Sequence, residues 1–192
     1  MKNLKTISFL LFFLISGLVN AQNEFYNKEF NWKINIPDNF ENFTEKEWEK
    51  IQQKGKAAIE KSTGQKVINQ SKTILVFRTD QLNYFEANYQ PFNPAKDGSY
   101  SENIKFINKT LTKTFIDNIP GCKVSSEITK EKINGLEFYK IYMKIIYPNK
   151  IVFHSYMYSR LFGKKDFSAN IMFIDEDKGK IMLENFKNST FK

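Results

Sequence analysis

The chain has 192 residues and a formal net charge of +8, from 29 lysines and arginines against 21 acidic residues. Only Arg78 and Arg160 are arginines, and sites that read bases or phosphates favour a planar guanidinium, so we expect no nucleic-acid partner. One cysteine, Cys122, and one histidine, His154, exclude a disulfide framework and leave no zinc pattern. We therefore expect no metal and no other cofactor.

The first 21 residues have the three parts of a secretory signal peptide. Lys2 and Lys5 form a basic start, residues 7–19 are apolar, and a Val-Asn-Ala motif ends at Ala21. The apolar run is shorter than the roughly 20 residues that cross a bilayer, and an uncleaved N-terminal anchor is the alternative. We predict a signal peptide over residues 1–21 and a periplasmic or secreted protein.

Residues 22–192 would remain after cleavage, a length that suits one domain with its own core. They contain no repeat, no linker and no second long apolar segment, so we expect no transmembrane segment and a monomer.

The first predicted elements are a strand and a helix. In "FNWKINIPDNF" (residues 30–40), apolar and polar side chains alternate until Pro37, which cannot donate to a ladder. We expect this strand to join the main antiparallel sheet. Thr44 and Glu47 then have the spacing of a capping box, and helical periodicity continues to Gly64.

Two strands and a second helix follow. Residues 72–79 and 84–92 are rich in β-branched and aromatic side chains, which favour strands. Over residues 102–118 the apolar side chains recur at helical spacing, and Pro120 ends this predicted helix.

Four consecutive strands are predicted over residues 123–133, 136–147, 151–161 and 167–174. The first turn, Asn134-Gly135, is the strongest two-residue hairpin signal. Three pairings set the register: Ile133 with Leu136, Tyr147 with Ile151, and Leu161 with Phe167. One face then gathers apolar side chains: Val124, Ile128, Tyr139, Ile141, Met143, Ile145, Ile151, Phe153, Met157, Leu161, Phe167, Ala169, Ile171 and Phe173. This pattern predicts an antiparallel meander with a core side.

A last helix is predicted after Asp175, where an acidic run complements the helix dipole. The same run hints at a calcium loop, but its glycine is fifth rather than sixth and its twelfth residue is Phe186, so helix capping is the better interpretation. The predicted fold class is α+β, one domain with a mostly antiparallel sheet and helices packed on it.

This order of elements resembles the PsbP-like superfamily, an α/β/α sandwich. The residues that carry the resemblance are "FNWKINIPDNF", "INGLEFYKIYMKI" and the closing "IMLENFKNSTFK". The superfamily includes extrinsic photosystem proteins, a Ran-binding relative and many exported bacterial proteins of unknown role. The resemblance covers about residues 28–192 and implies the sandwich fold, but it transfers no functional residue to this chain.

The second face of the predicted meander carries the candidate binding residues. Cations and hydroxyl-bearing rings gather there: Lys140, Tyr142, Lys144, His154, Tyr156, Tyr158 and Arg160. Such a face can hold an acidic glycan or another anion by charge, hydrogen bonds and stacking. A solvated sheet face and a face partly covered by a helix are the alternatives.

We find no catalytic cluster in the sequence. His154 and Ser155 are neighbours on a strand and point to opposite faces, so they cannot form a nucleophile–base pair. The favoured function is a non-catalytic binding or accessory module for an anionic ligand or an envelope protein. The alternative is a small periplasmic hydrolase that uses carboxylates such as Asp80, Glu86 or Asp97.

Overall fold

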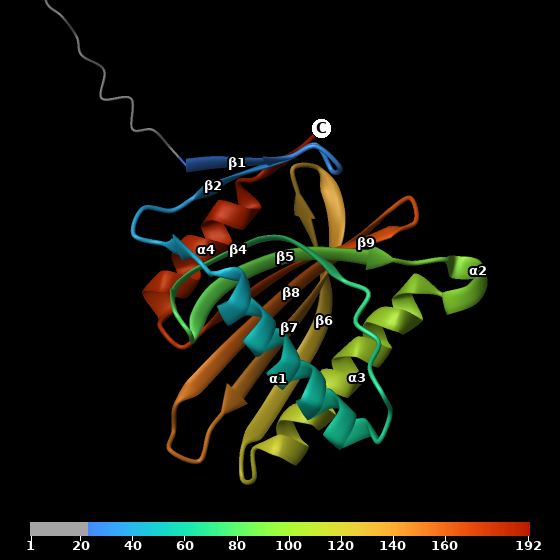
Figure 1. Ribbon diagram of the computed structural model, residues 1–192, viewed down its shortest axis with the longest axis vertical. Helices are drawn as coiled ribbons and strands as arrows, with labels where there is room; N and C mark the ends of the chain where they lie inside the picture. Colours follow the sequence, from blue (N-terminus) through green and yellow to red (C-terminus); the bar gives the residue numbers. More distant parts are fainter. Residues whose placement is uncertain (1–22) are drawn as a thin grey trace, which may run out of the picture.

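The computed structural model describes residues 23–192 and places them in three layers (Figure 1). The predicted signal peptide lies outside the described residues. A seven-stranded antiparallel sheet forms the middle layer, two long helices cover one face, and a helix with a small sheet covers the other. The fold is α+β with one domain, as predicted. No helix among residues 23–192 is long and apolar enough to cross a membrane.

The central sheet has the strand order β3-β4-β5-β9-β8-β7-β6. Its strands are β3 (Glu41–Asn42), β4 (Lys72–Asp80), β5 (Asn83–Pro91), β6 (Lys123–Ile133), β7 (Leu136–Ile146), β8 (Val152–Phe162) and β9 (Lys165–Phe173). The β4–β5 hairpin joins the meander where β5 pairs with β9. All the strands predicted between residues 72 and 174 are therefore present.

One face of the sheet is covered by α1 (Glu45–Thr63) and α3 (Tyr100–Asn118), with the short α2 (Pro94–Asp97) before α3. The predicted capping box is present at the start of α1, where Thr44 and Glu47 satisfy each other's backbone N–H groups. Ile104 of α3 is fully buried in a cluster with the apolar residues of β7 and β8. The predicted helical stripe thus faces the predicted apolar side of the meander.

The other face is covered by α4 (Glu176–Lys187) and by a three-stranded sheet of β1 (Asn23–Asn27), β2 (Trp32–Ile36) and β10 (Thr190–Phe191). The prediction that the opening strand joins the main sheet is wrong, because β2 pairs only with β1 and β10. Its apolar face packs across the main sheet instead of extending it. Trp32 is fully buried, and its Nε1 donates to Ser189 Oγ at 2.9 Å.

Two of the three predicted turn registers are confirmed. Asn134-Gly135 joins the pair Ile133–Leu136, and both turn residues have the positive φ that a type I′ turn requires. At the second turn Tyr147 N donates to Ile151 O, as the predicted pairing demands.

The third register is wrong by one residue, because Leu161 pairs with Asp166 rather than with Phe167. The connection is a two-residue turn in which Gly163 has φ of 61°. The shift turns over four side chains of β9, which lie on the α4 face and not on the α3 face: Phe167, Ala169, Ile171 and Phe173. Both faces of the sheet are buried, so apolar side chains on either face fit a core and cannot fix this register.

Candidate functional site

The predicted binding residues lie on the face that carries α4, and the structure divides them into two groups, with Lys140 apart from both in an ion pair with Glu131. Tyr158 is fully buried against Phe186 of α4, and its hydroxyl donates to Glu131 at 3.2 Å. The Arg160 guanidinium lies over the ring of Phe162, and its Nη1 donates to a backbone carbonyl. Tyr158 is therefore a core residue, whereas Arg160 is partly exposed and is held at the edge of the core.

The second group forms what we call the tyrosine ledge, defined as Tyr142, Lys144, His154 and Tyr156. Tyr142 opposes Tyr156, and Lys144 opposes His154, on the adjacent strands β7 and β8. The rings of the two tyrosines lie 4.5 Å apart, and both side chains are partly exposed, as is Lys144. His154 is only 7% exposed, with its ring stacked on Phe173.

A chain of hydrogen bonds runs through the ledge. The Tyr142 hydroxyl lies 2.9 Å from His154 Nδ1. On the other side of the imidazole, Nε2 lies 3.0 Å from the carboxylate of Glu176, in the first turn of α4. Glu176 accepts only from a protonated Nε2, so the neutral ring carries its proton there and its Nδ1 accepts from Tyr142.

The tyrosine and histidine side chains of the ledge are neutral hydrogen-bonding groups at neutral pH. Burial raises the pKa of Tyr142 and raises that of Tyr156 to about 12, so both hydroxyls stay protonated at neutral pH. Burial also lowers the pKa of His154, and this effect outweighs the nearby Glu176. The tyrosines are therefore hydrogen-bond donors, not nucleophiles.

The two lysines of the predicted site differ in whether they form an ion pair. Lys140 lies 3.2 Å from Glu131, which also pairs with Lys187 at 2.7 Å. Lys144 forms no ion pair with any residue between 23 and 192. Of the lysines predicted for this site, Lys144 is the one with its charge available to a ligand.

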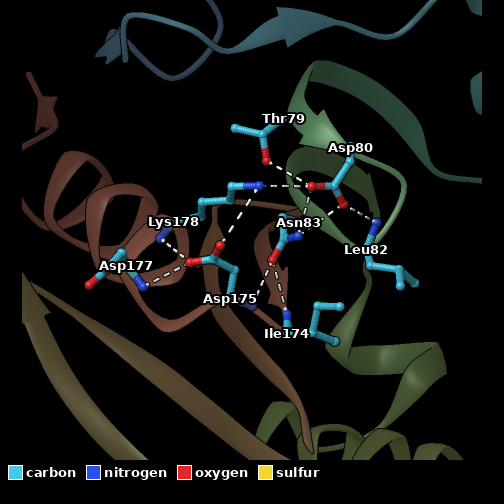
Figure 2. Close-up of polar contacts among 8 residues, drawn as sticks. All are labelled: Thr79, Asp80, Leu82, Asn83, Ile174, Asp175, Asp177 and Lys178. Atoms are coloured by element: carbon cyan, nitrogen blue, oxygen red, sulfur yellow. Dashed lines mark hydrogen bonds and ion pairs between the residues drawn. The ribbon is translucent and has the colours of Figure 1, made fainter. Parts of the chain in front are cut away.

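Asp80 is a candidate carboxylate of the alternative hydrolase. Its side chain accepts hydrogen bonds from several neighbouring residues that hold the β4–β5 turn, and together they form the Asp80 cluster (Figure 2). Its oxygens accept from Leu82 N at 2.9 Å, from Asn83 Nδ2 at 2.8 and 2.9 Å, and from Lys178 Nζ at 3.1 Å. Burial alone would raise the pKa of Asp80, but these hydrogen bonds lower it to about 2. An anion held in this way is a poor general base.

The same cluster explains the acidic run at the start of α4. Asp175 accepts from the backbone N–H groups of Asp177 and Lys178, which makes it the N-cap of the helix. Figure 2 shows Asn83 between the two carboxylates, with its side-chain carbonyl turned to the backbone of Ile174 and Asp175. No group of three or more acidic, histidine or cysteine side chains suited to a metal occurs within residues 23–192.

The other two candidate carboxylates do not meet Asp80 or each other in one pocket. Glu86 is buried in mid-β5, where it accepts from Asn88 and Asn170, and burial raises its pKa. Asp97 lies on α2 at the edge of a surface hollow that Asp80 and Glu86 do not line. This scatter gives no support to a carboxylate pair.

Sequence reasoning missed Asp166, which is 1% exposed and sits beneath the start of α3. It accepts from Tyr100 Oη at 2.6 Å and from Gln90 Nε2 at 3.3 Å, and burial raises its pKa. In the sequence it follows the Gly163 turn and resembles an exposed turn residue, so no local pattern signals its burial. Cys122 is half-buried, with its sulfur 3.5 Å from Phe115 O.

No protein-family profile and no curated protein matches this chain. The structure is similar to the solution structure of cyanobacterial PsbP (CyanoP) from Synechocystis sp. PCC 6803, with a TM-score of 0.58. The match covers 92% of this chain and 96% of that one. The chain has a PsbP-like fold. Sequence identity is 10%, so the likeness extends to the fold and transfers no site.

Proposed function

We propose that this chain is an exported, non-catalytic accessory module whose tyrosine ledge binds a carboxylate-rich segment of a partner protein. The observation that carries the proposal is Lys144, a cation with no acidic partner among the described residues, next to two partly exposed tyrosines. A carboxylate placed there accepts charge-assisted hydrogen bonds from the Lys144 ammonium and from the Tyr156 hydroxyl, because the Tyr142 hydroxyl already donates to His154.

The chemistry of the ledge supports binding over turnover. Its hydroxyls remain protonated at neutral pH, and its histidine is neutral and hydrogen-bonded on both sides. Asp80, Glu86 and Asp97, which the hydrolase alternative needs close together, lie in three different environments. Export rests on the signal-peptide pattern of residues 1–21, and N-terminal analysis of the exported protein should find Gln22 first.

The test is a binding titration with an octaglutamate peptide at about 0.01 M and about 0.15 M salt, which shortens electrostatic reach from about 30 Å to about 8 Å. We expect weaker binding at the higher salt. Lys144→Glu should abolish binding. The matched change Lys109→Glu should not, because Lys109 is an exposed residue of α3 in the opposite layer.

Three results would contradict the proposal. The first is equal binding by the Lys144→Glu variant and the unaltered protein. The second is binding that does not change with salt. The third is binding of an oligogalacturonate in place of the peptide, which would make the ligand an acidic glycan. Circular dichroism of each variant confirms that the fold is intact.

A further inference from the structure

A surface hollow lies on the α3 side of the sheet, opposite the face that carries the tyrosine ledge. It encloses about 870 Å³, within the size range of small-molecule sites. The end of β5, the start of α3, α2 and the segment between α1 and β4 line it. Neither the tyrosine ledge nor the Asp80 cluster contributes to it.

Two exposed apolar side chains flank this hollow. Ile68 is 77% exposed and Phe106 is 63% exposed, and they are the two most exposed large apolar side chains between residues 23 and 192. Single exposed apolar residues are ordinary on a surface. Two that line the same hollow, beside Phe92 and Pro91, give it an apolar wall.

The rest of the lining is rich in carboxamides. Gln90 donates to the buried Asp166, which fixes its side chain and leaves its Oε1 as an acceptor. Asn93 accepts from Ala95 N, which leaves its Nδ2 as a donor. Two further lining amides, Gln70 and Asn103, make no side-chain hydrogen bond to another residue in the part of the chain that the structure describes.

The charges at the hollow cancel. Glu102 pairs with Lys105 at 2.7 Å, and Asp97 accepts from the backbone N–H of Asn93. Lys96, Asp97 and Glu102 line the hollow with a net charge of −1, and Lys105, which pairs with Glu102 from outside the lining, brings the sum of the four charges to zero. A charged ligand gains little from such a lining, whereas a neutral ligand with many hydroxyl groups meets both donors and acceptors.

We propose that this hollow binds a neutral oligosaccharide. The ring of Phe106 receives the apolar C–H face of a sugar, and Gln70, Gln90, Asn93 and Asn103 exchange hydrogen bonds with its hydroxyls. Asp166 and Tyr100 hold Gln90 in place from beneath, so part of the site is formed before the ligand arrives. The proposal does not depend on the tyrosine ledge.

The experiment is a titration of the isotope-labelled protein, followed by nuclear magnetic resonance. The probes are cellohexaose, maltohexaose, xylohexaose and chitohexaose, with an oligogalacturonate and an uncharged apolar hexapeptide as the rival ligands. We expect at least one neutral oligosaccharide to shift the side-chain amide signals of Gln70 and Asn103, with a Kd of about 1 mM or below, equivalent to about −4.1 kcal/mol or stronger.

Variants locate the site. Phe106→Ala should weaken this binding by about tenfold or more, and Asn103→Ala should weaken it in the same direction. Ile116→Ala is the matched control, because Ile116 is a 52% exposed apolar residue of the same helix that does not line the hollow. It should leave the Kd unchanged, and so should Lys144→Glu on the ledge.

The proposal is overturned if none of the four oligosaccharides shifts the amide signals of the hollow. It is also overturned if Phe106→Ala binds as well as the unaltered protein, or if the apolar hexapeptide binds in the hollow and the sugars do not. Since the ledge variants are titrated in parallel, failure here is distinguishable from failure of the proposed function.

Discussion

Asn83 connects two parts of the chain that are about 90 residues apart, because its side chain bonds to Asp80 and to Asp175 at the same time. Its Nδ2 donates to both Asp80 oxygens, and its Oδ1 accepts from Asp175 N at 2.9 Å and from Ile174 N at 3.0 Å. The side chain is 2% exposed. The β4–β5 turn is thereby fixed to the start of α4, next to the glutamate that holds His154.

Asn83→Ala should destabilise the protein by about 2–4 kcal/mol, because it leaves the backbone N–H groups of Ile174 and Asp175 without an acceptor in a buried place. Urea unfolding measures the change. Asn185→Ala is the control, since Asn185 makes one local hydrogen bond on the solvent side of α4. A loss no larger than that of the control would show that the connection does not stabilise the fold.

The low pKa of Asp80 predicts a loss of stability in acid. Its folded pKa, about 2, lies below the ordinary value of 3.8, so its contribution is complete above about pH 4 and is lost as pH falls toward 2. Because 43% of the side chain is exposed, we expect only about 1 kcal/mol after solvent screening. The free energy of unfolding of the Asp80→Asn variant should depend less on pH between about pH 2 and about pH 4 than that of the unaltered protein.

His154 should make stability depend on pH near neutrality. Burial lowers its folded pKa below 6.5, so the unfolded chain binds more protons and stability should decrease as pH falls below about 6.5. A protonated Nδ1 also cannot accept from Tyr142, which breaks the chain of hydrogen bonds.

The measurement is the free energy of unfolding between about pH 5 and pH 7.5. His154 is the only histidine of the chain, so His154→Gln should remove most of the slope in this range. A slope of the same sign that persists in the variant would contradict this assignment, because the raised pKa values of Glu86 and Asp166 make stability increase, not decrease, as pH falls.

Local patterns predicted the elements well, because each has its own signal. The capping box at Thr44, the Asn134-Gly135 turn and the alternation of β7 all act within a few residues. Local patterns could not predict which residues of the binding face are buried and which are accessible. Tyr158 and Tyr156 lie on the same face of β8, but Tyr158 packs on Phe186 of α4 and is buried, whereas Tyr156 is partly exposed.

The missed features have a related cause. The register of β9 stayed ambiguous because the sheet has a core on each side, and its two faces differ little in apolar character. Asp166 and the carboxamides of the hollow come from four separate segments, so their meeting depends on tertiary packing. No periodicity or spacing in a single sequence indicates that these residues lie close together.

Gly179 provides a test of the packing between α4 and the sheet. A Cβ at this position would lie 2.4 Å from the ring of Phe173, which is 2% exposed and stacks on His154. Gly179→Ala should therefore destabilise the protein by about 1–3 kcal/mol, although alanine favours helix by up to about 1 kcal/mol. Gly55→Ala in α1 is the matched control: its Cβ meets nothing within 4 Å, so the same substitution should stabilise.

Phe173→Leu should relieve part of the clash between the methyl group introduced by Gly179→Ala and the ring, and a double-mutant cycle measures the coupling. If Gly179→Ala were as stabilising as Gly55→Ala, α4 would not pack on Phe173 as closely as described.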